Sequence, residues 1–181
     1  LPTSKTLRKW LGKLDLPTWV VDPSGRDVDG LRRRASHLTL TTEGFASVLA
    51  NGEGQGIDWG DFWAEREAQA SASLDAQLSD APFAFEGSAA WSLSRTLPAD
   101  TPVFAASSMP VRDLEFFWRP NDERRQIFFN RGANGIDGTL STALGVAWSG
   151  SPTVLLTGDL ALLHDANGFL TIPKFKGSLT I

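Results

Sequence analysis

The sequence has no cysteine, and histidine appears only twice in its 181 residues. Without cysteine the chain has no disulfide framework, thiolate nucleophile or cysteine-ligated metal site. No apolar run approaches the roughly 20 residues that a membrane-spanning helix needs. The net charge is −4, and the one basic run, Arg32-Arg33-Arg34, is short. A nucleic-acid surface needs clustered Lys and Arg, so we expect neither nucleic-acid binding nor an integral membrane segment.

The sequence alternates between segments with helical spacing of apolar residues and short apolar runs typical of strands. Hydrophobic residues make up 41% of the chain, which predicts a packed core. Apolar segments switch between helical spacing and short strand-like runs, and this predicts α/β architecture with a parallel sheet and flanking helices. Helices are expected within 1–16, over 61–79, 85–96, 138–149 and 160–171, and after the turn 107–110, where Val111, Leu114 and Phe117 form an apolar side. Strands are expected at 18–21, 38–40, 102–106, 126–130, 153–157 and 178–181.

The turn Asp80-Ala81-Pro82 ends the long helix and divides the chain into two predicted domain pieces, 1–80 and 81–181. The last strand rises to Ile181 with no turn after it, and no initiator methionine precedes Leu1. We therefore expect the sequence to be a fragment of a longer protein.

The chemistry is concentrated between residues 130 and 160. Glycines at 132, 135 and 138 allow close approach of the backbone to a ligand. The apolar strand that follows delivers Gly158 and Asp159 to its carboxyl end, where ligands bind in open α/β sheets. A helix beginning there offers free N–H groups to a phosphate, and a carboxylate beside it can hold Mg²⁺. Taken alone, Asp159 is better explained as a helix N-cap, and Asp137 as a cap of the helix over 138–149.

The run Asn130–Gly138 reads Asn-Arg-Gly-Ala-Asn-Gly-Ile-Asp-Gly. Together with Ser141-Thr142-Ala143, and with Gly158-Asp159-Leu160 followed by Asp165 and Asn167, it resembles the thiamine-diphosphate-dependent enzymes. Among these it is most similar to the MenD-type family, the 2-succinyl-5-enolpyruvyl-6-hydroxy-3-cyclohexene-1-carboxylate (SEPHCHC) synthases. The resemblance extends over the whole chain and is strongest from Phe104 onward.

The resemblance implies a fold, a reaction and partners. Residues 81–181 would be the truncated first half of the pyrophosphate-binding domain, and residues 1–80 the end of the middle domain. The family uses thiamine diphosphate with Mg²⁺ or Mn²⁺ to decarboxylate 2-oxoglutarate. It adds the resulting succinyl-semialdehyde carbanion equivalent to isochorismate in menaquinone or phylloquinone biosynthesis. Its members are homodimers or homotetramers with active sites between subunits, in the cytoplasm or the chloroplast stroma.

The resemblance also assigns roles to individual residues. The substrate-binding positions are Ser108, Arg112, Arg131 and Lys5; the cofactor-binding positions are Asn134, Ile136, Gly158 and Asp159, and Asp159 is also the metal ligand. No catalytic residue is expected within the chain, because the family's glutamate comes from the N-terminal domain of the partner subunit. The chain alone is therefore expected to be inactive.

Other interpretations remain open. A different thiamine-diphosphate lyase or synthase, related to acetolactate synthase, would usually have Gly-Asp-Gly where this chain has Gly158-Asp159-Leu160. A noncatalytic phosphate-binding or assembly module could keep the same fold. Arg131 alone could form a surface salt bridge, although a guanidinium is suited to bidentate binding of a substrate carboxylate.

Overall fold

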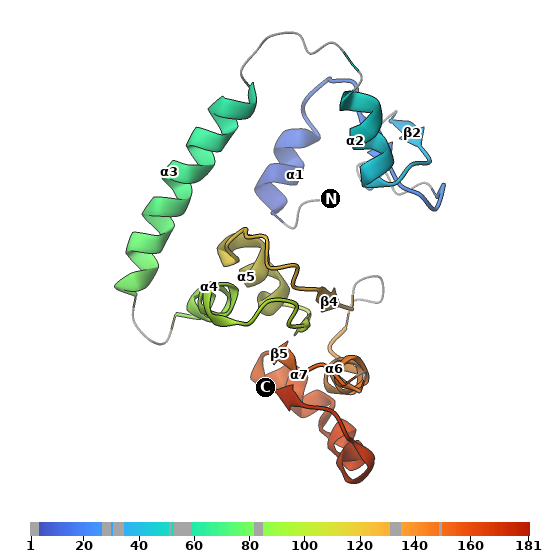
Figure 1. Ribbon diagram of the computed structural model, residues 1–181, viewed down its shortest axis with the longest axis vertical. Coiled ribbons are helices and arrows are strands. Elements are labelled where there is room, and N and C mark those ends of the chain that lie inside the picture. The colour runs from blue at the N-terminus through green and yellow to red at the C-terminus, as the bar shows by residue number, and fades with distance from the viewer. Residues whose placement is uncertain are drawn as a thin grey trace. The chain divides into compact units, whose positions relative to one another are not determined.

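The computed structural model describes residues 4–26, 30, 35–50, 52, 59–81, 85–130, 135–148 and 150–181. The chain forms two compact units, Leu1–Asp61 and Phe62–Ile181. Each unit has its own parallel sheet, of two strands in the first and four in the second. The elements of both are labelled in Figure 1. Among the helices of these described ranges, none is both long and apolar enough to cross a membrane.

Within its described residues, the first unit contains the helices α1 (Lys5–Leu11) and α2 (Thr42–Ala50) and a pair of parallel strands, β1 (Trp19–Val21) and β2 (Ser36–Leu38). Ser4 is the N-cap of α1, since its hydroxyl accepts a hydrogen bond from a backbone N–H of the first turn at 3.3 Å. The strand expected at 38–40 lies two residues earlier. After β2 the chain turns at once, because the N–H of Leu40 donates to the carbonyl of Leu38 at 2.9 Å.

The second unit contains the alternating helices and strands predicted for the later part of the chain. They are α3 (Trp59–Ser79), α4 (Gly87–Thr96), β3 (Val103–Ala105), α5 (Met109–Phe117), β4 (Ile127–Phe129), α6 (Thr139–Ala147), β5 (Thr153–Leu156), α7 (Asp159–His164), the 3₁₀ helix η1 (Ala166–Lys174) and β6 (Leu179–Thr180). The strand order is β4-β3-β5-β6 and every pairing is parallel. The predicted α/β fold, a parallel sheet with flanking helices, is therefore confirmed.

Helices cover both faces of this sheet (Figure 1). Phe104 and Leu155 pack with Leu140 and other α6 residues on one face. Ala105, the next residue along β3, packs with Ala90 of α4 and with α5 on the other face. Successive residues of β3 thus enter two separate cores, as the period of two in a strand requires. Parallel strands buried on both faces read as continuous apolar runs, which is how they were recognised in the sequence.

The strand order identifies where the chain reverses its direction across the sheet. From β3 the chain passes through α5 to β4, and from β4 it crosses back through α6 to β5 on the other side of β3. The strand order therefore reverses between β3 and β5, because β4 lies on one side of this pair and β6 on the other. Ligands bind at such a switch point, outside the carboxyl ends of the strands. The loops that follow β3 and β5 are therefore where this fold would bind a ligand.

The single helix expected over 160–171 is wrong. The α-helix ends at His164, and Asp165 leaves the helical conformation with φ −110° and ψ 26°. The 3₁₀ helix η1 then runs from residue 166 to 174. Asp165 departs from the helix where its carboxylate reaches another element: it accepts hydrogen bonds from Ser141 of α6.

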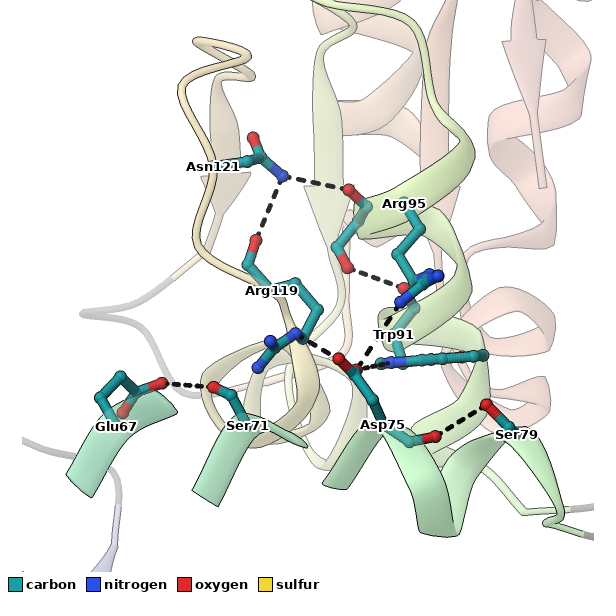
Figure 2. Close-up of polar contacts among 9 residues, drawn as sticks. Glu67, Ser71, Asp75, Ser79, Trp91, Arg95, Arg119 and Asn121 are labelled. Carbon is teal, nitrogen blue, oxygen red and sulfur yellow. Dashed lines mark hydrogen bonds and ion pairs between the residues drawn. The ribbon is translucent and has the colours of Figure 1, made fainter. Parts of the chain in front are cut away.

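Helix α3 is attached to the rest of the second unit through Asp75. Figure 2 shows this carboxylate pointing toward side chains of α4 and of the segment after α5. Its Oδ1 accepts from the indole Nε1 of Trp91 at 2.7 Å and lies 3.3 Å from Nε of Arg119 and 3.7 Å from Nη1 of Arg95. This attachment places α3 in the second compact unit. The predicted domain pieces, 1–80 and 81–181, concern the family's domain organisation and remain a prediction.

Candidate functional site

The carboxyl edge of the four-stranded sheet collects exposed polar residues from three loops. The backbone N–H of Ala106 donates to the carbonyl of Leu156 at 2.9 Å, which joins the ends of β3 and β5 at the switch point. The hydroxyl of Ser107 donates to the carbonyl of Asn130 at 3.2 Å, which joins the ends of β3 and β4. These two hydrogen bonds hold the chain together just beyond the ends of β3, β4 and β5. Ser108, the next residue after Ser107, therefore begins from a backbone that is anchored on both sides of β3.

Ser108 has a strained backbone. Its φ is +81° and its ψ is −125°, a conformation that residues with a side chain rarely adopt. The residue is exposed and occupies the N-cap position of α5 without a side-chain capping bond. Its carbonyl accepts a hydrogen bond from the guanidinium of Arg112, one turn along the same helix. Strain of this kind costs of order 1–3 kcal/mol and clusters at functional sites. The roles of Ser108 and Arg112 in substrate binding stay a prediction.

Asp159 lies at the carboxyl end of β5, but it does not cap α7. The N-cap is Gly158, in extended conformation, and Asp159 is the first helical residue, with no side-chain capping bond at this terminus. The alternative explanation of Asp159 as an N-cap is therefore wrong. The carboxylate is exposed. Mg²⁺ is bound by one or two carboxylates together with substrate phosphates, so one exposed carboxylate at a ligand-binding edge fits such an ion.

The glycine loop between β4 and α6 is described from Gly135 onward. Gly138 is the N-cap of α6 and has a φ of +69°, in the left-handed region that favours glycine. The prediction that Asp137 caps this helix is thus wrong. The Asp137 carboxylate instead lies 3.1 Å from Nδ1 of His164. The carbonyl of the half-buried Ile136 accepts a bond from the hydroxyl of Thr139 at 2.8 Å, so the loop is folded back on the start of the helix.

The cap that α6 lacks locally comes from Asp165. Its Oδ2 accepts from the backbone N–H of Ser141 at 2.6 Å, and its Oδ1 accepts from the Ser141 hydroxyl at 3.1 Å. The two residues are 24 positions apart. No local sequence signal links them, although both belong to the segments that carry the family resemblance.

The predicted site residues divide into three groups. The structure gathers Ser108, Arg112, Ile136, Gly158 and Asp159 on or beside the carboxyl edge of one sheet. Arg131 and Asn134 lie outside the described residues. Lys5 is the exposed first residue of α1, in the first unit. Its predicted contact with substrate stays a prediction.

Sequence reasoning missed Asp113, on α5 one residue after Arg112. Its side chain is buried, with only 6% of the residue exposed. Burial raises the pKa of the Asp113 carboxyl, the charge of Glu86 raises this pKa further, and Arg112 opposes both. The neighbouring charges of Arg112 and Glu115 are typical of an exposed helix face, so the burial of this carboxylate is visible only in the packed structure.

A parallel sheet with helices on both faces and polar loops at its switch point is an α/β fold of the kind that binds ligands at the carboxyl ends of its strands. No protein-family model matches the chain. Among curated proteins it is similar to 2-succinyl-5-enolpyruvyl-6-hydroxy-3-cyclohexene-1-carboxylate synthases. It is 49% identical to that of Synechococcus sp. (strain JA-3-3Ab) over 181 residues, which is all of the chain and 30% of the relative. It is 48% identical to that of Gloeothece citriformis (strain PCC 7424) over 182 residues, again the whole chain and 31% of the relative.

The resemblance predicted from the glycine loop and the Gly158-Asp159 turn is therefore confirmed along the full length of the chain. The chain spans about 30% of the length of the curated relatives that it matches. This chain resembles one part of a SEPHCHC synthase.

Proposed function

We propose that the chain is part of a SEPHCHC synthase, a transferase that depends on thiamine diphosphate and on Mg²⁺ or Mn²⁺. Its substrates are 2-oxoglutarate and isochorismate, in menaquinone or phylloquinone biosynthesis. The proposal rests on one observation: a chain 49% identical to a named synthase carries, at the switch point of a parallel sheet, a Gly158-Asp159 turn whose Asp159 is exposed. Residues 1–80 then correspond to the middle domain and residues 81–181 to the pyrophosphate-binding domain.

In this proposal the residues of the chain bind and orient. Asp159 holds the metal ion, whose charge offsets that of the cofactor diphosphate. Ile136 and Asn134 contact the cofactor rings, while Ser108 and the guanidinium groups of Arg112 and Arg131 hold substrate carboxylates through charge-assisted hydrogen bonds. When bound, thiamine diphosphate supplies the electron sink for the decarboxylation and for formation of the new carbon–carbon bond.

The remaining parts of the proposal concern the whole protein. Lys5 reaches an isochorismate carboxylate from the middle domain. The acid–base glutamate comes from a domain outside these 181 residues in the partner subunit of a homodimer or homotetramer. The isolated chain is therefore inactive, and the intact protein works in the cytoplasm or in the chloroplast stroma.

The experiment uses the full-length protein and the substitution Asp159→Asn. A ligand stabilises a protein by RT ln(1 + [L]/Kd), so thiamine diphosphate with Mg²⁺ should raise the Tm of the wild type and not that of the variant. The Tm without cofactor should hardly change, because Asp159 is exposed and caps nothing. Asp122→Asn, an exposed carboxylate in the loop before β4, is the matched control and should respond as the wild type does.

Two results would contradict the proposal. If Asp159→Asn gains as much Tm from the cofactor as the control, Asp159 is not the metal ligand. If the wild-type protein, supplied with thiamine diphosphate, Mg²⁺ and both substrates, releases no carbon dioxide and forms no product by mass spectrometry, the proposed reaction is wrong.

A further inference from the structure

The first turn of α6 depends on a side chain from another element. The first N–H groups of a helix have no partner within the helix, and the N-cap Gly138 has no side chain to offer them. The carboxylate of Asp165 takes that place, with bonds of 2.6 and 3.1 Å to the backbone N–H and the hydroxyl of Ser141. A negative charge at a helix N-terminus is also favoured by the helix dipole.

The same short segment contacts α6 and the glycine loop at two further points. His164, immediately before Asp165, places its Nδ1 3.1 Å from the Asp137 carboxylate. Gly168 is buried against the first turn of α6. A Cβ added to it would lie 3.0 Å from the Ser141 hydroxyl and 3.2 Å from the side chain of Leu140. Residues 164–168 therefore lie against the start of α6, and a larger residue at 168 would require its neighbours there to shift by a few tenths of an ångström.

These contacts connect the two loops that the proposed site needs. Asp159 begins the helix that His164 ends, so residues 159–168 form a continuous segment from the metal-binding turn to α6. Ile136 lies in the glycine loop, between the β4 strand and the turn that residues 164–168 hold. The exposed pair of Asp137 and His164 contributes little energy by itself, because solvent screens it. The charge-assisted bonds of Asp165 are the stronger part.

We infer that Asp165, assisted by His164, is a positioning residue that fixes residues 135–138 and the start of α6 to the segment that follows the Asp159 turn. Through these contacts Asp165 raises the affinity for thiamine diphosphate without contacting the cofactor. This second part rests on the proposed function. A loop that is ordered before the ligand arrives binds it more tightly, because less conformational freedom is lost on binding.

The test compares Asp165→Ala, Asp165→Asn and Arg125→Ala in the full-length protein. Arg125 makes side-chain bonds to backbone at the opposite end of the sheet, so Arg125→Ala controls for a general loss of stability. One readout is amide hydrogen exchange of residues 135–147 without cofactor. The other is the Kd of thiamine diphosphate, measured by calorimetry at fixed Mg²⁺, together with kcat at saturating cofactor.

Asp165→Ala should speed exchange at Ser141 and raise the Kd about tenfold, as expected for loss of a charge-assisted hydrogen bond, with kcat changed far less. Asp165→Asn should recover most of the affinity, because an amide oxygen can still accept from the Ser141 N–H. Arg125→Ala should lower the Tm and leave the Kd unchanged.

If the wild type binds the cofactor but Asp165→Ala binds it equally well, or if exchange at Ser141 is unaltered, the inference is wrong while the proposed function stands. If Arg125→Ala raises the Kd as much as Asp165→Ala, the effect is one of general stability and the inference is again wrong. A wild type that does not bind thiamine diphosphate overturns the proposed function and the affinity part with it.

Discussion

The two ends of the four-stranded sheet are built differently. At the amino end, side chains satisfy backbone carbonyls: Arg125 donates to Ser94 at 2.9 Å, to Pro98 at 3.2 Å and to Leu97, and Asn121 donates to Ser94 at 3.1 Å. At the carboxyl end, Ser108 has a strained backbone, and the exposed Asp159 carboxylate makes no capping bond. The polar groups of the amino end thus stabilise the fold, whereas we propose that those of Ser108 and Asp159 bind a ligand.

The largest effect should come from removing Arg125 at the amino end. Arg125→Ala leaves three carbonyl groups without their cationic donor, and we expect a loss of about 3 kcal/mol, since bonds to charged groups contribute roughly 1.5–3 kcal/mol each and water replaces part of them. The measurement is the Tm of the full-length protein. Arg124→Ala, its exposed neighbour, is the control and should stay near the wild-type value. Equal losses from both substitutions would refute this assignment of stability to the amino end.

The attachment of α3 should give the next largest effect. Asp75→Ala removes the acceptor shared by Trp91 and Arg119, at a cost of about 1–2 kcal/mol. Asp75→Asn keeps an acceptor for the indole N–H and should cost less. Trp91→Phe removes that N–H together with part of the ring over which the guanidinium of Arg95 lies, 4.8 Å from the ring centroid, and should therefore cost more than Asp75→Asn. Thermal unfolding of the three variants tests this order, and a Tm for Asp75→Asn as low as that of Asp75→Ala would contradict it.

Substitution of Ser108 should raise the stability of the protein, whereas substitution of the amino-end residues should lower it. Glycine accepts a φ of +81° without strain, so Ser108→Gly should raise the stability by about 1 kcal/mol while weakening substrate binding. The comparison is Asp100→Gly, a residue with φ +59° at the amino end of the sheet. That change should leave the KM values for both substrates unaltered. A Ser108→Gly protein that is more stable and equally active would show that its strain serves no ligand.

The smallest effect concerns the buried carboxyl of Asp113. Its folded-state pKa is raised by burial, so the folded protein binds this proton more tightly than the unfolded chain does. The stability that the group contributes is full below its unfolded pKa and is lost as the pH rises through the folded pKa. Asp113→Asn should therefore raise the Tm at pH 7, and this gain should shrink as the solution is acidified toward pH values below about 3.8. A gain that is independent of pH would contradict the assignment.

Local patterns predicted the class of fold and one edge of the site. The apolar runs predict the buried strands, and the run at 153–157 places the turn at Gly158 and Asp159 at the carboxyl end of a strand, as in the structure. The error at Asp159 is a shift of one residue. Gly and Asp are both accepted at N-caps, so propensity could not decide which of two neighbours would take the position.

Local sequence patterns do not predict contacts between residues that are far apart in the sequence. The bonds of Asp165 to Ser141 depend on how η1 packs on α6, and a helical period continued past residue 164 predicted one helix instead. Likewise, aspartate is favoured at N-caps, but the N-cap of α6 is the next residue, Gly138, in the left-handed conformation. Burial of Asp113 depends on α4 lying against α5. For Asp165 and Asp113, tertiary packing overrode the local tendency, whereas at Asp137 the neighbouring residue took the cap position.

The cap supplied by Asp165 also has a consequence for how the protein is made. Synthesis proceeds from the N-terminus, so Ser141 leaves the ribosome 24 residues before the carboxylate that completes its turn. Until then the nascent α6 has a glycine at its start and no side chain to close its first turn. We expect this part of the sheet edge to mature only after α7 has emerged, so that a ribosome stalled before residue 165 carries a chain whose helical start is still open.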